Sequence, residues 1–201
     1  MRRRFIVFAA LALFIAPVSA LSQTPAPASI ASYVESVRKS GDFHGSILVA
    51  DKGGIIFQRS VGYANYEWDV PNARDTVFRI GSITKQFTAV LVLQEVGRGS
   101  IKLSDTISKY LPYYRKDTGG QVTISQLLNH ASGIPDLVPD FSAKYERYAY
   151  GWQEFVEKFC SGDLKFPPGT KFSYSNSGYY ILGAILEAVT GKGKEQTPGV
   201  S

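Results

Sequence analysis

The spacing of hydrophobic residues divides the first half of the chain into a helix followed by a β-hairpin. Apolar residues recur at helical spacing in ASIASYVESVRK, residues 28–39. Two runs rich in β-forming residues follow, GSILVAD (45–51) and IIFQRSVGYA (55–64), and a Lys-Gly-Gly turn separates them. Two such runs joined by a short glycine turn predict an antiparallel hairpin.

From residue 78 onward the pattern is that of helices. FRIGSITKQFTAVLVLQ (78–94) predicts an almost wholly apolar helix that begins at Ser82, runs into Val96 and ends near Gly97 or Gly99. Three short helical segments with Gly and Pro stops come next. The order expected is therefore one helix, two strands and then helices only. These segments are LSDTISKYLPYY, TISQLLNHASGIP and YGWQEFVEKFCSG, before a last apolar helix in SGYYILGAILEAVTG.

The two predicted strands need more partners than the sequence offers. A two-stranded hairpin is marginally stable by itself, and no further strand pattern follows it. The final residues, KGKEQTPGVS (192–201), are polar and resemble the end of a frameshifted or truncated reading frame. We therefore expect part of a larger domain, in which the later strands of the sheet are missing.

The N-terminus has the pattern of a secretory signal peptide. Three arginines, an apolar run and a small-residue cleavage site fill residues 1–20, and a Pro/Ala/Ser linker follows at 21–29. A membrane anchor is the alternative, but the apolar run is short for a span. We expect export to the periplasm or medium, no stable membrane span after the signal is removed, and a partial domain over 30–201.

Charge and cysteine content exclude some functions. The leader holds three of the 22 basic residues, so 19 remain against 17 acidic ones. With no basic run left, nucleic-acid binding is not expected. The single Cys160 cannot form an internal disulfide, and its helical context favours packing. His44 and His130 form no HExxH or HxH set, so we expect no metal or cofactor, and His130 is interpreted as holding a turn.

The candidate chemistry starts with Ser82 and Lys85. Residues three apart share a face of a helix, and a lysine in apolar surroundings binds its proton less tightly, so it can act as a base toward a serine hydroxyl. The alternative is that Ser82 is an ordinary N-cap and Lys85 reaches into solvent. Ser36 and Lys39 have the same spacing, but they lie on a polar helix face and are expected to be solvated.

A second candidate is the Tyr-Ser-Asn run before the last helix. The phenol of Tyr174 can relay a proton, and the amide of Asn176 can both donate and accept hydrogen bonds. The alternative is that Ser175 or Asn176 caps the helix. No G-x-S-x-G is present, so there is no candidate for an α/β-hydrolase nucleophile.

Four segments together resemble the serine β-lactamase-related family, which includes class C β-lactamases, DD-peptidases and related esterases. The likeness covers about residues 33–191. It implies an α/β (α+β) two-lobe fold of the serine β-lactamase and penicillin-binding-protein type, here incomplete, with the helix, the hairpin and the all-helical lobe. The segments are GSILVADKGGIIFQRSVGYANYE, FRIGSITKQFTAVLVLQEVGRGSIKLSDTISKYLP, ISQLLNHASGIPD and FPPGTKFSYSNSGYYILGAILEAVTG.

The resemblance also implies roles for individual residues. Ser82 would be the acylated nucleophile, with its own N–H as one oxyanion donor, and Lys85 would be the base. Tyr174 would exchange protons with nucleophile and leaving group, and Asn176 would orient the substrate amide. One departure is that no Lys- or His-Ser/Thr-Gly tripeptide follows Asn176.

The expected function is that of an exported serine hydrolase acting on a lactam, a D-amino-acid peptide or an ester through an acyl-serine intermediate. Its partners would be small-molecule or peptide substrates, and no pattern indicates an oligomeric state. Two alternatives stay open. One is a catalytically inactive truncated fragment, and the other is a penicillin-recognising module that does not turn over.

Overall fold

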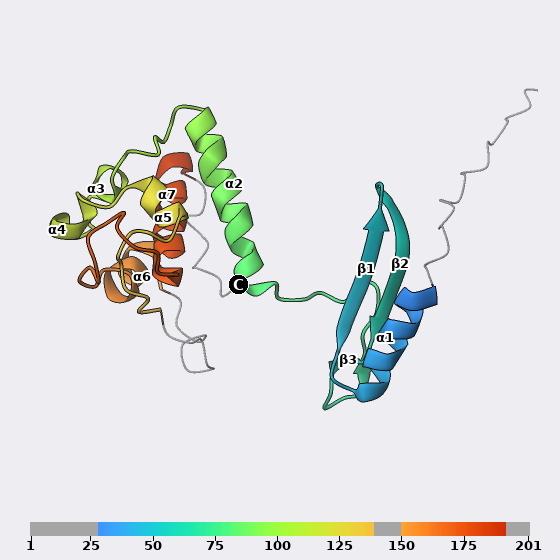
Figure 1. Cartoon of the computed structure of the whole chain (residues 1–201). Coiled ribbons are helices and arrows are strands. Elements are labelled where there is room, and N and C mark those ends of the chain that lie inside the picture. The colour runs from blue at the N-terminus through green and yellow to red at the C-terminus, as the bar shows by residue number, and fades with distance from the viewer. Residues whose placement is uncertain (1–27, 139–149, 192–201) are drawn as a thin grey trace, which may run out of the picture. The chain divides into compact units, whose positions relative to one another are not determined.

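The structure is a computed structural model that describes residues 28–138 and 150–191. The chain divides into two compact units, Met1–Phe78 and Arg79–Ser201, which are described separately (Figure 1). The predicted signal peptide, residues 21–27 of the predicted linker and the polar ending lie outside the described residues.

The first unit contains one helix and two pairs of strands. The helix begins at Ala28, so Ala28 and Ser29, the last two residues of the predicted linker, belong to it. β1 and β2 pair antiparallel, which confirms the predicted hairpin, and their register shifts once between Val49 and Ala50. The elements are α1 (Ala28–Ser40), β1 (Gly45–Asp51), β2 (Gly54–Val61), β3 (Tyr63–Asn65) and β4 (Val70–Pro71).

The helix and the hairpin of this unit are in contact and bury few apolar side chains. Val34 of α1 and Val61 of β2 are each only 4% exposed, and they are the buried hydrophobic side chains of the described part of this unit. Arg59 of β2 also forms an ion pair with Glu35 of α1, with an N–O distance of 3.0 Å. Figure 1 shows α1 lying alongside the two long strands. So small a core gives this unit little hydrophobic stabilisation.

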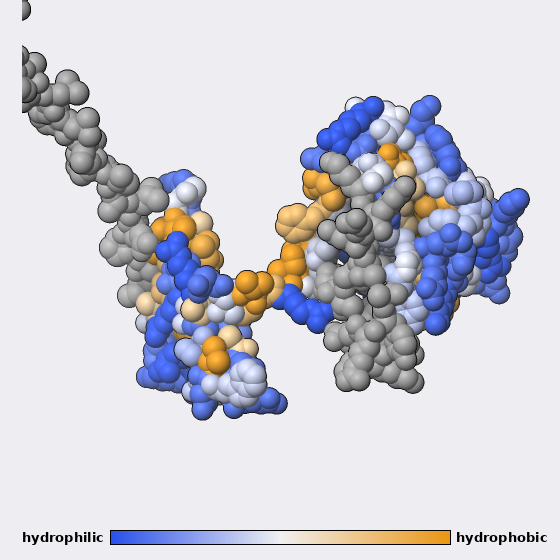
Figure 2. All heavy atoms as spheres, turned by 180° about the vertical axis from the view of Figure 1, so that it is seen from behind, coloured by the Kyte–Doolittle hydropathy of each residue, from blue (hydrophilic) through white to orange (hydrophobic). Residues whose placement is uncertain are grey.

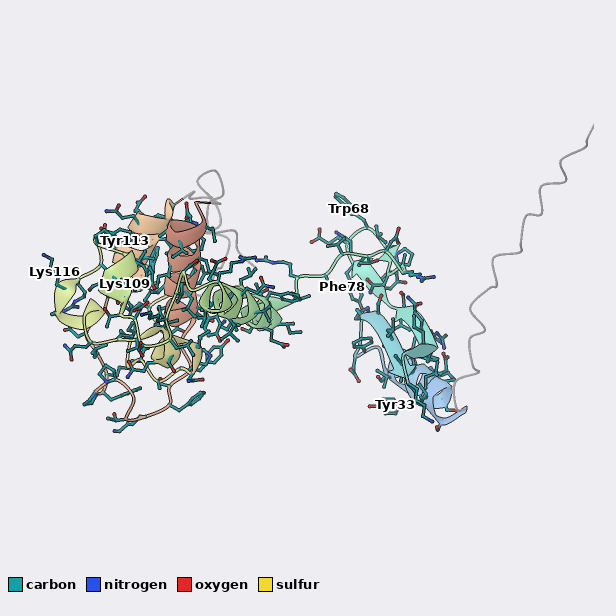
Figure 3. All side chains as sticks on the ribbon, turned by 90° about the horizontal axis from the view of Figure 1, so that it is seen from above. Tyr33, Trp68, Phe78, Lys109, Tyr113 and Lys116 are labelled. Atoms are coloured by element: carbon teal, nitrogen blue, oxygen red, sulfur yellow. The ribbon has the colours of Figure 1, made fainter. Side chains whose placement is uncertain are left out.

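The second strand pair corrects the expectation of helices only after the hairpin. β3 and β4 pair antiparallel, and strands this short show no usable alternation of polar and apolar residues. The Nδ1 atom of His44 accepts a hydrogen bond from the Tyr63 N–H at 3.0 Å and so ties β3 to the start of β1. Between β3 and β4 the Trp68 side chain projects into solvent and is 78% exposed (Figure 3).

The described residues of the second unit form helices joined by loops, with an isolated β-bridge between Thr106 and Thr123. Helices α2, α3, α5 and α6 all pack against α7, whose side chains Ile181, Leu182 and Ile185 are fully buried. α7 ends at Thr190, and the capping residue Gly191 after it adopts a left-handed conformation with φ of 65°. The elements are the 3₁₀ turn η1 (Gly81–Ile83), α2 (Thr84–Gly97), α3 (Ile107–Tyr110), α4 (Lys116–Gly119), α5 (Ile124–Leu128), α6 (Trp152–Phe159) and α7 (Asn176–Thr190).

Helix α2 ends at Gly97, as predicted, but it is less buried than its apolar sequence suggests. Only Val92 and Glu95 are buried along it. Phe87 is 61% exposed and Val90 is 54% exposed, so a run of apolar side chains lies on its surface. Hydrophobic residues gathered on the surface of the second unit are visible in Figure 2. Among the described helices, none combines the length and the hydrophobicity that crossing a bilayer requires.

Candidate active site

Ser82 lies in the 3₁₀ turn that leads into α2. Gly81 before it has φ of 53°, a left-handed conformation that glycine adopts without strain. Lys85 follows one turn later, and its Nζ donates a hydrogen bond to the Ser82 Oγ at 3.3 Å. Neither η1 nor α2 has a side-chain N-cap bond, so the alternative that Ser82 is an ordinary helix cap is wrong.

The Tyr-Ser-Asn run reaches the same place from the start of α7. The Tyr174 hydroxyl donates to the Ser82 Oγ at 2.8 Å, and the Lys85 Nζ donates to the Asn176 Oδ1 at 2.7 Å. Ser175 between them caps α7, because its Oγ accepts a hydrogen bond from the Gly178 N–H. The structure therefore brings all four predicted site residues together, and the capping alternative holds only for Ser175.

Lys85 is the centre of this group. Its Nζ also lies 5.0 Å from the centroid of the Tyr174 ring and 5.7 Å from that of Tyr179, within the range of cation–π attraction. Its side chain is half-buried, whereas Ser82 and Tyr174 are exposed. The amine therefore contacts the serine, the phenol and the amide at once, on a surface that a substrate can reach.

The charge of Lys85 changes the acidity of Tyr174. Burial by itself would raise the pKa of the phenol, but the hydrogen bonds with Lys85 and Ser82 and the charge of Lys85 outweigh it, and the pKa of Tyr174 is lowered. A phenol with a lowered pKa releases its proton more readily. The site thus has two groups that can carry a proton, an amine and a phenol, next to one serine oxygen.

His130 supports the segment that carries Tyr174. Its backbone has φ of 55°, its carbonyl accepts from the Ser173 N–H at 2.8 Å, and its Nδ1 accepts from the Ser175 N–H at 3.2 Å. Its ring lies 4.5 Å from that of Tyr174. Burial, with the charge of Lys85, lowers the pKa of His130, which favours a neutral ring with its proton on Nε2. His130 holds a turn, as interpreted from the sequence.

One residue of the site was missed. Asp136 accepts a hydrogen bond from the Asn176 Nδ2 through its Oδ2 at 2.9 Å, and its Oδ1 accepts from the Ser177 N–H at 3.2 Å. In the sequence it is the last residue of ISQLLNHASGIPD, a segment noted only for its family resemblance. Nothing in the local pattern distinguishes this aspartate from one that ends a turn.

Other candidates lie outside the site. Ser36 donates to the Tyr33 carbonyl at 2.7 Å, and both Ser36 and Lys39 are exposed. Cys160 is fully buried at the end of α6, and burial raises its pKa to about 12, which fits a packing role. Within residues 28–138 and 150–191, no three His, Cys, Asp or Glu side chains are grouped so as to hold a metal ion.

Comparison with known proteins gives a family and several relatives. The family model for Beta-lactamase matches residues 30–197. Penicillin-binding protein 4* of Bacillus subtilis (strain 168) is 31% identical over 160 residues, which cover 78% of this chain and 35% of that protein. The penicillin-binding protein of Bacillus halodurans, a solved structure, is 31% identical with a TM-score of 0.67, covering 79% of this chain and 49% of that one.

A hydrolase is also among the similar structures. EstCE1, described as a hydrolase with promiscuous acyltransferase activity, is 26% identical with a TM-score of 0.68, and the match covers 82% of this chain and 48% of that one. The chain thus spans about a third of the curated relative and about half of each solved structure. Because the family model covers most of its residues, the chain belongs to the Beta-lactamase family and carries part of the serine β-lactamase and penicillin-binding-protein fold.

Proposed function

We propose that the protein is an exported serine hydrolase that forms an acyl-enzyme on Ser82 with a lactam, a D-amino-acid peptide or an ester. The observation that carries this proposal is the position of the Ser82 Oγ. It lies 3.3 Å from the Lys85 Nζ and 2.8 Å from the Tyr174 hydroxyl. A serine oxygen needs such a neighbour, because a hydroxyl is a weak nucleophile until its proton is removed.

In the first step, the lone pair of neutral Lys85 takes the Ser82 proton while the serine oxygen attacks the substrate carbonyl carbon. The carbonyl electron pair moves onto its oxygen, which the Ser82 N–H would stabilise. When the carbonyl re-forms, the bond to the leaving nitrogen or oxygen breaks, and that atom takes the Tyr174 proton. The Lys85 ammonium then returns a proton to the phenolate. The lowered pKa of Tyr174 supports this donor role.

Family membership and relatives named for penicillin binding and hydrolysis support the reaction class, and the leader pattern supports export. The same group of residues around Ser82 is also compatible with a module that is acylated without turnover, or with an inactive fragment. The three candidates differ in acylation and in turnover.

Covalent labelling tests the proposal. A fluorescent penicillin and a fluorophosphonate are each incubated with the chain, and the adduct is located by mass spectrometry. We expect label on Ser82, none after Lys85→Ala, and unchanged labelling after Lys39→Ala, the matched control from the exposed Ser36–Lys39 pair. Steady turnover of a chromogenic ester or lactam separates a hydrolase from a binding module. Absence of label from the wild-type chain would contradict acyl-serine chemistry.

A further inference from the structure

Asp136 holds the start of α7 through both of its carboxylate oxygens. Oδ1 accepts from the Ser177 N–H at 3.2 Å and lies 3.4 Å from its hydroxyl, while Oδ2 accepts from the Asn176 Nδ2 at 2.9 Å. A carboxylate at a helix N-terminus is also favoured by the helix dipole. The backbone next to it is fixed independently, since the Leu137 N–H donates to the Ser177 Oγ at 3.3 Å. Asp136 is therefore well placed to impose an orientation on Asn176.

An ionised carboxylate only accepts hydrogen bonds, whereas a side-chain amide has a donating end and an accepting end. Opposite Asp136, the amide of Asn176 must present its NH₂ group, and its oxygen then faces the Lys85 amine, as observed at 2.7 Å. An ammonium would select this orientation unaided, because it only donates. A neutral amine would not, because it can both donate and accept.

This difference matters at the moment when Lys85 acts as a base. A neutral amine has one lone pair. If the Asn176 NH₂ group faced it, that group would donate to the lone pair and compete with the Ser82 hydroxyl. With the amide oxygen facing it instead, Lys85 donates an N–H to Asn176, and its lone pair stays available to the serine.

We propose that Asp136 is a positioning residue that keeps the amide oxygen of Asn176 toward Lys85 and so leaves the Lys85 lone pair free for the Ser82 proton. The inference rests on the proposed role of Lys85 as the base. Asp136 acts through Asn176 and does not itself contact Ser82 or the reacting carbonyl.

If Asp136 has this role, replacing it by asparagine should be more harmful than replacing it by alanine. In Asp136→Asn, the new amide keeps its oxygen on the Ser177 N–H, because that donor needs an acceptor. Its NH₂ group then faces Asn176, which turns its own oxygen toward it and its NH₂ toward Lys85. The nearly isosteric variant therefore reverses the orientation of the Asn176 amide, whereas Asp136→Ala only removes the group that fixes this orientation. A residue that mattered for packing alone would tolerate asparagine better than alanine.

The experiment measures the rate at which the fluorophosphonate phosphonylates Ser82, with loss of fluoride, in the full chain. We expect Asp136→Asn to react at least about tenfold more slowly than Asp136→Ala, which corresponds to one misdirected hydrogen bond to the base. In an Asn176→Ala background the two variants should react at equal rates, because the residue that transmits the effect is gone. Circular dichroism confirms that each variant is folded.

A second measurement needs no reaction. In ¹⁵N NMR spectra of the ligand-free chain, the Asn176 side-chain NH₂ resonances should shift in Asp136→Ala, because their charged acceptor is lost. If the wild type is labelled but Asp136→Asn reacts as fast as Asp136→Ala, the inference is overturned and the proposed function stands. If the wild type takes no label, the proposed function falls. Unshifted NH₂ resonances would then overturn the orientation imposed by Asp136 as well.

Discussion

The segment after α5 contains a glycine whose replacement should destabilise the helical unit more than its conformation alone would suggest. Gly133 has φ of 77°, and a Cβ atom added there would lie 2.3 Å from the backbone oxygen of Phe166. Its own carbonyl accepts a hydrogen bond from the Lys165 N–H at 2.8 Å. The two segments are thus too close for a methyl group, and hydrogen bonds hold them there.

The expected cost of Gly133→Ala has two parts. Placing an alanine in the left-handed region costs about 1 kcal/mol. Relieving the contact means moving one backbone segment away from the other, which weakens the Lys165 bond and the bond from the Gly169 N–H to the Ala131 carbonyl at 2.7 Å, each worth about 1 kcal/mol. We therefore expect a loss of about 3 kcal/mol in the free energy of unfolding of this unit.

Urea unfolding followed by tryptophan fluorescence measures this loss. Trp152 at the start of α6 reports on the helical unit, and replacing the exposed Trp68 of the first unit by phenylalanine leaves it as the only tryptophan (Figure 3). Gly191→Ala is the matched control, because Gly191 has φ of 65° and open space around its Cβ position. It should lose only about 1 kcal/mol.

The test compares the loss of unfolding free energy in Gly133→Ala with that in Gly191→Ala. If Gly133→Ala loses no more stability than Gly191→Ala, the contact with Phe166 is relieved without disturbing the hydrogen bonds. The argument from backbone proximity would then be wrong. A loss shared equally by both variants would reflect the left-handed conformation alone.

Three further outcomes are expected. The Cys160 thiol is buried, and its pKa is raised to about 12. It should therefore react with a maleimide only at urea concentrations that unfold the chain. Rapid modification of the native chain, detected by mass spectrometry, would contradict its burial. Because the pKa of His130 is lowered in the folded state, the unfolded state takes up the proton first as the pH falls below about 6.5. The free energy of unfolding, measured by urea titration, should therefore be lower at pH 5.5 than at pH 7.5. The decrease should be smaller in His130→Asn. Backbone amides of β1 and β2 should exchange with deuterium faster than those of α7, since only two hydrophobic side chains are buried among residues 28–78, the described part of the first unit. Equal protection by mass spectrometry would show that the hairpin is stabilised by more than its own core.

Much of the fold could be predicted from local sequence. The hairpin followed from two β-forming runs and a glycine turn, and the end of α2 followed from its glycines; both are confirmed. The fold class rested on the family resemblance, and the family model and solved structures confirm it. The β3–β4 pair was not foreseen, because strands of two or three residues are too short to show a period.

The apolar sequence of α2 suggested dry surroundings for Lys85, and this part of the reasoning was wrong for the outer face of the helix. Phe87 and Val90 are more than half exposed. Hydrophobicity shows which side chains would gain from burial, but it does not show which are buried, since that depends on what packs against them. The lysine is half-buried instead, with the rings of Tyr174, just before α7, and of Tyr179 in α7 beside its amine.

By itself, the sequence determined the β1–β2 hairpin, the end of α2 and the spacing that lets Lys85 reach Ser82, because a helical turn brings residues three apart onto one face. Only the tertiary structure decided that Asn176 meets Lys85 from 91 positions away, and that Asp136 sits on the far side of the same amide. The physical reason is that these contacts depend on the packing of α7 against α2 and α5. No local pattern of polar and apolar residues specifies where one helix places its first side chains relative to another.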